Sequence, residues 1–252
     1  MKKEFQCNKI LLSNENVNDF FMPAWKGVHQ TVLLTIRGFF ATYLITLMII
    51  SIIEANSVVW LTFATSWNYA INTAYFLSAF SISLYGHMNS SKTNDVERAG
   101  EKERSDFKLP VKFQLFWILF NISITLCLVV VIIYWPLLHD PDIPRNGLQT
   151  YLTIDRHGIN FLFLVIDFFL HKTPLRFLHF VYPSLLAVVY LVFNVLYWVS
   201  TDNIVYPIFD WNKNPGMASG YAVGILLIVM LAHFVWYWLN KGKETLVSSV
   251  QK

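Results

Sequence analysis

Charged residues are scarce in this chain of 252 residues: Asp, Glu, Lys and Arg together make up only 14% of it. Hydrophobic residues make up 55% and aromatic residues 17%. A soluble domain carries about 25% charged residues, so this balance excludes an ordinary soluble enzyme and favours a protein that crosses a membrane several times. No long polar stretch is left for a separate soluble domain. The net charge of +3 is spread between segment ends, and we therefore expect no nucleic acid partner.

Cysteine is almost missing as well. Cys7 lies near the amino end and Cys127 lies in the middle of an apolar run, which excludes a disulfide framework. The seven histidines have no carboxylate or cysteine partners at ligand spacing, so we expect no metal site and no other cofactor. The first 31 residues lack an apolar core. We therefore expect no cleavable signal peptide, and the first spanning helix takes over targeting.

Long apolar segments make up most of the remaining chain. Because a helix needs about 20 apolar residues to cross a bilayer, we predict six spans, at residues 32–53, 58–85, 113–138, 152–171, 177–199 and 216–240. Residues 1–31 form an N-terminal segment, residues 86–112 a charged connector and residues 241–252 a basic tail. The predicted fold class is an all-α bundle of six transmembrane helices.

Basic residues set the predicted orientation. They gather before the first span, in the connector, between the fourth and fifth spans, and in the tail, whereas the alternate loops are richer in aspartate. The positive-inside rule then places both termini in the cytoplasm, as an even number of spans requires. The expected location is the plasma membrane or the endoplasmic reticulum.

Polar residues follow one face of the fourth predicted span. With helical spacing, this face carries His157, Asn160, Leu164, Asp167 and His171. Such a stripe is costly in lipid unless it meets polar groups or water, so we expect neighbouring helices to cover it. Asn121 and Asn194 are the partners that the sequence suggests for Asp167. Arg37, within about two turns of the start of the first span, is expected to snorkel to the headgroups.

Two polar residues of separate spans are predicted to meet. The second and fourth spans both run inward from the outer face, so Thr62 and His157 enter within roughly 10 Å of the outer boundary. A threonine hydroxyl needs a base to become a nucleophile, and histidine is the usual base. Thr65, Asn72 and Asn160 are candidates to orient the imidazole or stabilise an oxyanion. The structural alternatives are that Thr62 bonds to a carbonyl of its own helix and that His157 caps its helix.

The run HGIN…D…HKTPLRFLHFVYP and the later IVYPIFDW resemble the Rolling stone family of animal membrane proteins. More distantly, the run WLTFAT around Thr62, the pair His157-Gly158 and the later VYP are similar to the androgen-induced six-span membrane hydrolases. The resemblance covers roughly residues 55–240. It implies cleavage of fatty acid esters of hydroxy fatty acids by a threonine and a histidine, which are Thr62 and His157 in this sequence. Arg156 departs from that pattern, since those hydrolases have asparagine before the histidine.

Three classes of function follow. The first is an intramembrane threonine hydrolase that acts on a lipid ester, with membrane lipids as its partners. The second, which the Rolling stone resemblance implies, is a non-catalytic membrane protein of cell–cell contact or myoblast-type fusion, acting through the predicted loops at 139–150 and 200–215. The third is a proton or solute carrier built on Asp167, which is the least favoured because inverted repeats are absent from the sequence. The sequence leaves the oligomeric state open.

Overall fold

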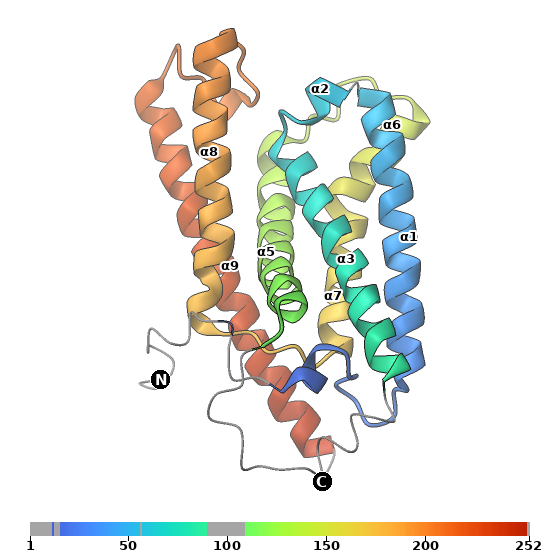
Figure 1. Cartoon of the computed structure of the whole chain (residues 1–252). Helices are drawn as coiled ribbons and strands as arrows, with labels where there is room; N and C mark the ends of the chain where they lie inside the picture. Colours follow the sequence, from blue (N-terminus) through green and yellow to red (C-terminus); the bar gives the residue numbers. More distant parts are fainter. Residues whose placement is uncertain (1–11, 13–15, 56, 90–108, 251–252) are drawn as a thin grey trace.

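The computed structural model describes residues 12, 16–55, 57–89 and 109–250, and this part of the chain is mostly helical (Figure 1). The long helices are α1 (Gln30–Ala55), α3 (Ala64–Met88), α5 (Val111–Ile133), α8 (Val181–Thr201) and α9 (Pro215–Val250). The shorter α-helices are α2 (Ser57–Trp60), α6 (Gly147–Ile154) and α7 (Asn160–Leu170). Single turns of 3₁₀- or π-helix are η2 (Val17–Phe20), η4 (Tyr134–Leu138), η5 (Asp155–Ile159), η6 (Phe177–Phe180) and η7 (Pro207–Phe209). The predicted all-α fold class is confirmed for the described residues.

Within the part of the chain that the structure describes, four helical segments are long and apolar enough to cross a membrane, namely residues 30–55, 111–138, 177–201 and 215–250. Large apolar side chains are exposed along their outer faces, at Phe39, Ile49, Ile53, Leu185, Val192, Leu196, Val223, Leu227, Leu231 and Val235. Four of these residues on α9 recur every fourth position and so share one helix face. Exposed apolar faces of this extent are expected where a helix contacts lipid.

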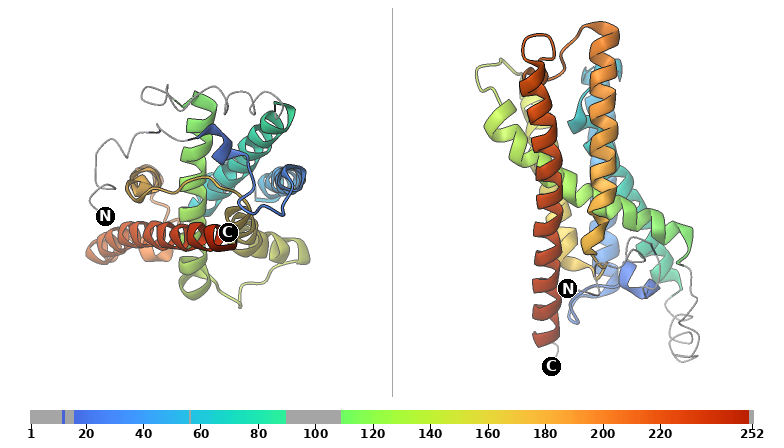
Figure 2. Two further views of the ribbon diagram at one scale, coloured as in Figure 1. Left: turned by 90° about the horizontal axis from the view of Figure 1, so that it is seen from below. Right: turned by 90° about the vertical axis from the view of Figure 1, so that its left-hand side faces the viewer.

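The helices form two groups that meet at α5. Helix α1 packs on α3, and α7 packs on α1 and α5. Helices α8 and α9 run side by side as the second group and pack against α5 (Figures 1 and 2). Helix α5 therefore has neighbours on both sides, and its buried side chains come from most of its length.

The second predicted span is interrupted rather than continuous. Its first turn forms α2. Trp60 of α2 donates a hydrogen bond from Nε1 to Ser51 Oγ of α1 at 2.6 Å, and this bond holds α2 against α1. Helix α3 begins only at Ala64, and its first amide groups lie free of intrahelical partners, as at every helix start. The Ala64 amide donates to the Tyr206 hydroxyl at 3.0 Å. Thr62 therefore lies in a turn before α3, and the prediction of a helical Thr62 is wrong.

The fourth predicted span also differs from the prediction in its start and in its helix type. It begins earlier than predicted, at α6, because Asn146 and Gln149 form a reciprocal capping box within the predicted loop 139–150. The wide π-helical turn η5 then joins α6 to α7. Such π-turns are uncommon and are found frequently at functional sites. His157 lies in this turn.

The carboxyl end of α7 is closed by residues from both ends of the chain. The Ala24 amide donates to Leu170 O at 2.7 Å and the Trp25 indole donates to Phe169 O at 2.8 Å. Helix α9 continues past the predicted boundary at residue 240 to Val250, which brings Lys243 to the neighbouring carbonyl groups of Phe168 and His171. Most of the predicted charged connector, residues 90–108, lies outside the described residues.

Candidate functional site

The polar stripe of the fourth predicted span lies inside the bundle. Its exposed fractions are 6% for His157, 0% for Asn160, 1% for Leu164, 0% for Asp167 and 0% for His171. Helices α1, α3 and α5 cover this face, as the cost of polar groups in lipid predicts. The interior of the bundle is thus unusually polar, while the outer surface is apolar.

Arg37 and Asp167 form a buried ion pair in this interior, near the end of the bundle that carries the N-terminal segment. Arg37 Nε donates to Asp167 Oδ1 at 2.8 Å and Arg37 Nη2 donates to Asp167 Oδ2 at 3.2 Å, with both side chains 0% exposed. The expectation that Arg37 snorkels to the headgroups is therefore wrong. The suggested partners of Asp167 are wrong as well, since Asn121 donates to Trp117 O. A buried charge is stable only when it is paired and hydrogen-bonded, and a guanidinium supplies both to a carboxylate in one contact.

Further hydrogen bonds complete the shell of this ion pair. Arg37 Nη1 donates to Ser83 Oγ at 2.9 Å and to Phe20 O at 3.3 Å. The Tyr75 hydroxyl donates to Asp167 Oδ2, and His171 Nε2 lies 3.5 Å from the same oxygen. The cluster joins α1, α3, α7 and the N-terminal segment. Since the carboxylate is enclosed and already bound, this arrangement favours a structural role for Asp167.

A second polar cluster lies around Cys127 of α5. The Cys127 thiol donates to Asn160 Oδ1 of α7 at 3.3 Å, and the amides of Asn68 and Asn72 on α3 lie beside the same thiol. Both amide atoms of Asn68 and both of Asn72 are buried without a hydrogen bond partner. The structure thus brings the predicted residues Asn72 and Asn160 together at Cys127. Sequence reasoning missed Asn68 and Cys127, although the spacing of four places Asn68 on the helix face of Asn72.

His157 is held in one orientation. Its Nδ1 lies 2.8 Å from Thr153 O, and because a carbonyl oxygen can only accept, Nδ1 carries the hydrogen. In the neutral ring this leaves Nε2 as the basic nitrogen. The imidazole stacks on the Tyr134 ring, with centroids 3.4 Å apart and planes at 7°, and Trp135 Nε1 donates to His157 O at 2.9 Å. A fixed ring with one free basic nitrogen is what general base catalysis needs.

Thr62 is held mainly through its backbone. The Tyr190 hydroxyl of α8 donates to Thr62 O at 2.9 Å, while Thr62 Oγ1 donates to Val59 O at 2.8 Å. The second contact is the structural alternative that the sequence offered for this threonine. Among the hydrogen bonds of the described residues, none joins Thr62 to His157. Tyr206 lies beside this turn in the loop before η7, and burial raises the pKa of its hydroxyl, which therefore stays neutral.

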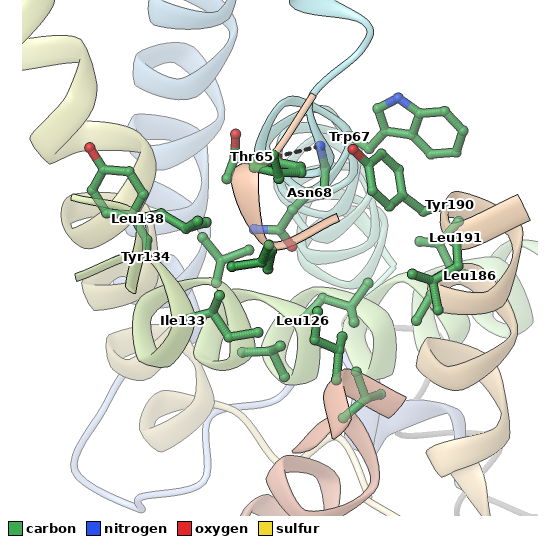
Figure 3. A pocket seen from close by; sticks show the side chains of 18 of the residues that line it. Thr65, Trp67, Asn68, Leu126, Ile133, Tyr134, Leu138, Leu186, Tyr190 and Leu191 are labelled. Carbon is green, nitrogen blue, oxygen red and sulfur yellow. Dashed lines mark hydrogen bonds between the residues drawn. The ribbon is translucent and has the colours of Figure 1, made fainter. Parts of the chain in front are cut away.

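An apolar cavity of about 120 Å³ lies between α3, α5, the α8–α9 pair and η7 (Figure 3). Its lining is dominated by aliphatic residues, including Leu126, Val129, Ile133, Leu186, Leu191 and Val229. Thr65 and Asn68 of α3 are among its few polar lining residues. Apolar concave sites with a small number of polar groups are typical binding sites for small molecules.

The cavity has neighbours of both predicted catalytic residues in its wall. Tyr190, which binds the Thr62 carbonyl, and Tyr134, on which His157 stacks, both line it. Thr62 and His157 are not themselves among the lining residues. Thr62 and His157 thus each contact a tyrosine that lines the cavity without lining it themselves.

These features define a helical membrane protein with an apolar outer surface, a polar interior and an apolar cavity. Residues 1–250 match the family model described as Protein rolling stone, and the chain therefore belongs to the Rolling stone family. It is similar to Protein rolling stone of Drosophila melanogaster, with 28% identity over 251 residues, 96% of this chain and 89% of the fly protein. No solved structure matches the chain.

Proposed function

We propose that this protein is a six-span membrane hydrolase that binds a lipid ester in the apolar cavity and cleaves it with Thr62 and His157. A fatty acid ester of a hydroxy fatty acid is the substrate class that the distant resemblance to the androgen-induced hydrolases suggests. The proposal depends mainly on one observation, namely that the cavity wall contains the two tyrosines that contact Thr62 and His157.

The chemistry needs a rearrangement at Thr62. Thr62 Oγ1 must leave Val59 O and come within hydrogen-bond reach of His157 Nε2, so that it can attack the ester carbonyl carbon and pass its proton to that nitrogen. The alcohol leaves with that proton, and the acyl group stays on Thr62. A water molecule then attacks the acyl-threonine carbonyl carbon while His157 takes a proton from it. The bond to Oγ1 breaks, the fatty acid is released, and His157 returns the proton to Thr62 Oγ1. Thr65, which lines the cavity, is the supporting residue best placed to donate to the developing oxyanion.

The proposed topology assigns the two remaining spans to α3 and to the α6–η5–α7 segment. Their buried polar residues lower their mean hydropathy, but both pack between apolar helices that meet the length and composition expected of a span. The segment η2 and the carboxyl end of α9 lie at the same end of the bundle, which supports an even number of crossings (Figure 1). Both ends are proposed to face the cytoplasm, at the plasma membrane or the endoplasmic reticulum.

The test is hydrolysis of fatty acid esters of hydroxy fatty acids by the full chain purified in detergent. We expect Thr62→Ala and His157→Ala each to lower kcat at least about 100-fold, the lower range for loss of a general base or nucleophile. Thr42→Ala is the matched control, because the exposed Thr42 hydroxyl likewise bonds back to a carbonyl, that of Gly38, at 2.9 Å. Activity that survives both site substitutions would remove this mechanism.

A non-catalytic role in cell–cell contact or fusion is the second candidate, and the bond from Thr62 Oγ1 to Val59 O favours it. In this case Thr62→Ala and His157→Ala leave function intact, whereas changes in residues 139–150 or 200–215 abolish adhesion or fusion between cells that express the protein. A carrier built on Asp167 receives less support, because that carboxylate is enclosed by Arg37 and Tyr75.

A further inference from the structure

Asn68 is a buried amide at the wall of an apolar cavity. Its side chain is 3% exposed and lines the cavity, yet neither Nδ2 nor Oδ1 has a hydrogen bond partner. Figure 3 shows this side chain extending from α3 toward α5 among Leu126 and Ile133. The nearby Cys127 sulfur is at most a weak acceptor, and the thiol already donates its hydrogen to Asn160 Oδ1. A buried amide left unpaired is costly, which points to a ligand that supplies the missing partners.

The two unpaired atoms restrict the chemistry of such a ligand. The amide offers a donor, Nδ2–H, and an acceptor, Oδ1, in one plane. A carboxylic acid group carries the matching acceptor and donor with the same planar spacing, so one group satisfies both atoms. An ester offers only acceptors and would leave Oδ1 unpaired, and an ionised carboxylate would leave it unpaired while losing its hydration.

The volume and the apolar lining of the cavity favour a ligand with an apolar chain. Its volume of about 120 Å³ far exceeds the roughly 10–15 Å³ that a single water requires. Leu186 and Leu191 of α8 and Val229 of α9 continue the apolar lining away from Asn68. A chain of methylene groups is the ligand part that such a lining favours.

From these observations we infer that Asn68 forms a head-group subsite that binds the un-ionised carboxylic acid of a long-chain fatty acid, with the acyl chain in the cavity. This inference rests on the proposed function in one respect, namely that an acyl chain enters the cavity. It adds that the acid released by ester hydrolysis is retained there. The protein then binds its own product, and a free fatty acid competes with the ester substrate.

The test is photolabelling of the full chain in detergent micelles with a diazirine-bearing long-chain fatty acid, competed by hexadecanoic acid or by its methyl ester. For the wild type at mildly acidic pH, we expect the acid to compete about tenfold better than the ester, because only the acid donates a hydrogen bond to the otherwise unpaired Asn68 Oδ1. At alkaline pH the acid ionises and this preference should disappear. Asn68→Leu should still be labelled, although at higher probe concentration because the probe is itself a fatty acid, and should lose the preference.

Asn72→Leu is the matched control, since Asn72 has the same unpaired amide one turn away on α3 but does not line the cavity. It should keep the preference. Asn68→Ala repeats the test if the leucine variant aggregates. Three results would overturn the inference. The preference for the acid could persist in the Asn68 variants, it could be lost equally in Asn72→Leu, or it could be missing from the wild type. If the wild type is not labelled at all, no acyl chain enters the cavity, and this inference fails. The hydrolysis assay tests the catalytic roles of Thr62 and His157 separately.

Discussion

Arg37 on α1 and Asp167 on α7 are 130 positions apart in the chain, yet Arg37 Nε lies 2.8 Å from Asp167 Oδ1 in an interior that leaves neither side chain exposed. Neither residue can lose its partner without leaving an uncompensated charge in that interior. The pair therefore fixes the relative position of α1 and α7, and with it the turn η5, which precedes α7 and carries His157.

Removing one partner of this pair should destabilise the fold. We expect Asp167→Asn and Arg37→Met each to lower the free energy of unfolding by about 3–5 kcal/mol. The double variant Arg37→Met/Asp167→Leu should be less destabilised than the sum of the two single changes, because no charge is left unpaired. Thermal unfolding of the detergent-purified chain measures this. Single variants as stable as the wild type would show that the ion pair does not hold the bundle together.

Gly86 lies at a close approach between α3 and the N-terminal segment. A Cβ atom at this position would lie 2.3 Å from a ring carbon of Phe21, which is only 2% exposed and has little room to move. Gly86→Ala should therefore lower the free energy of unfolding by about 1–3 kcal/mol. Gly220→Ala on α9 is the control, since a Cβ atom added there would have no neighbour within 4 Å and alanine favours helix by up to about 1 kcal/mol. Equal unfolding temperatures for the two variants would contradict this account.

Lys243 acts as a cap for α7. Its Nζ donates to Phe168 O at 2.7 Å and to His171 O at 3.1 Å, so its removal leaves carbonyl groups at a helix end without this donor. Lys243→Met should lower the free energy of unfolding by about 1–3 kcal/mol. Lys241→Met, two positions away, removes an exposed pair with Glu244 and should cost less than about 1 kcal/mol. Chemical denaturation in detergent distinguishes the two, and a larger loss for Lys241→Met would exclude the capping role.

Tyr134 should matter for catalysis through its ring rather than its hydroxyl. The ring stacks on His157, while the hydroxyl contacts His139 Nδ1 at 3.3 Å. Tyr134→Phe should keep kcat for ester hydrolysis close to that of the wild type. Tyr134→Leu should lower kcat by about 2- to 12-fold, because it loses a stacking contact of about 0.5–1.5 kcal/mol that orients the imidazole. Steady-state kinetics with purified variants gives both numbers. The reverse order would assign the effect to the hydroxyl.

The sequence predicted the features that depend on local pattern. Apolar runs and their flanking charges predict most helix ends within a few residues, except the starts of α3 and α6 and the end of α9. The three-and-four spacing predicts the buried polar face of α7. The local pattern does not predict which residues of different helices pair with one another. Asp167 could pair with any polar residue at similar depth, and only the packing of α1 on α7 selects Arg37. The break at Thr62 was missed because Tyr206 and Tyr190, far along the chain, bind the backbone groups that a continuous helix would have used.

The central claim is that Thr62, activated by His157, is a nucleophile at the apolar cavity. A covalent serine- and threonine-hydrolase probe, applied to membranes that contain the full chain, tests this most directly. We predict labelling of the wild type and of Thr42→Ala, reduced labelling of His157→Ala and loss of labelling in Thr62→Ala. Labelling of Thr62→Ala at the wild-type level, or wild type that resists the probe while it hydrolyses esters, would contradict the claim.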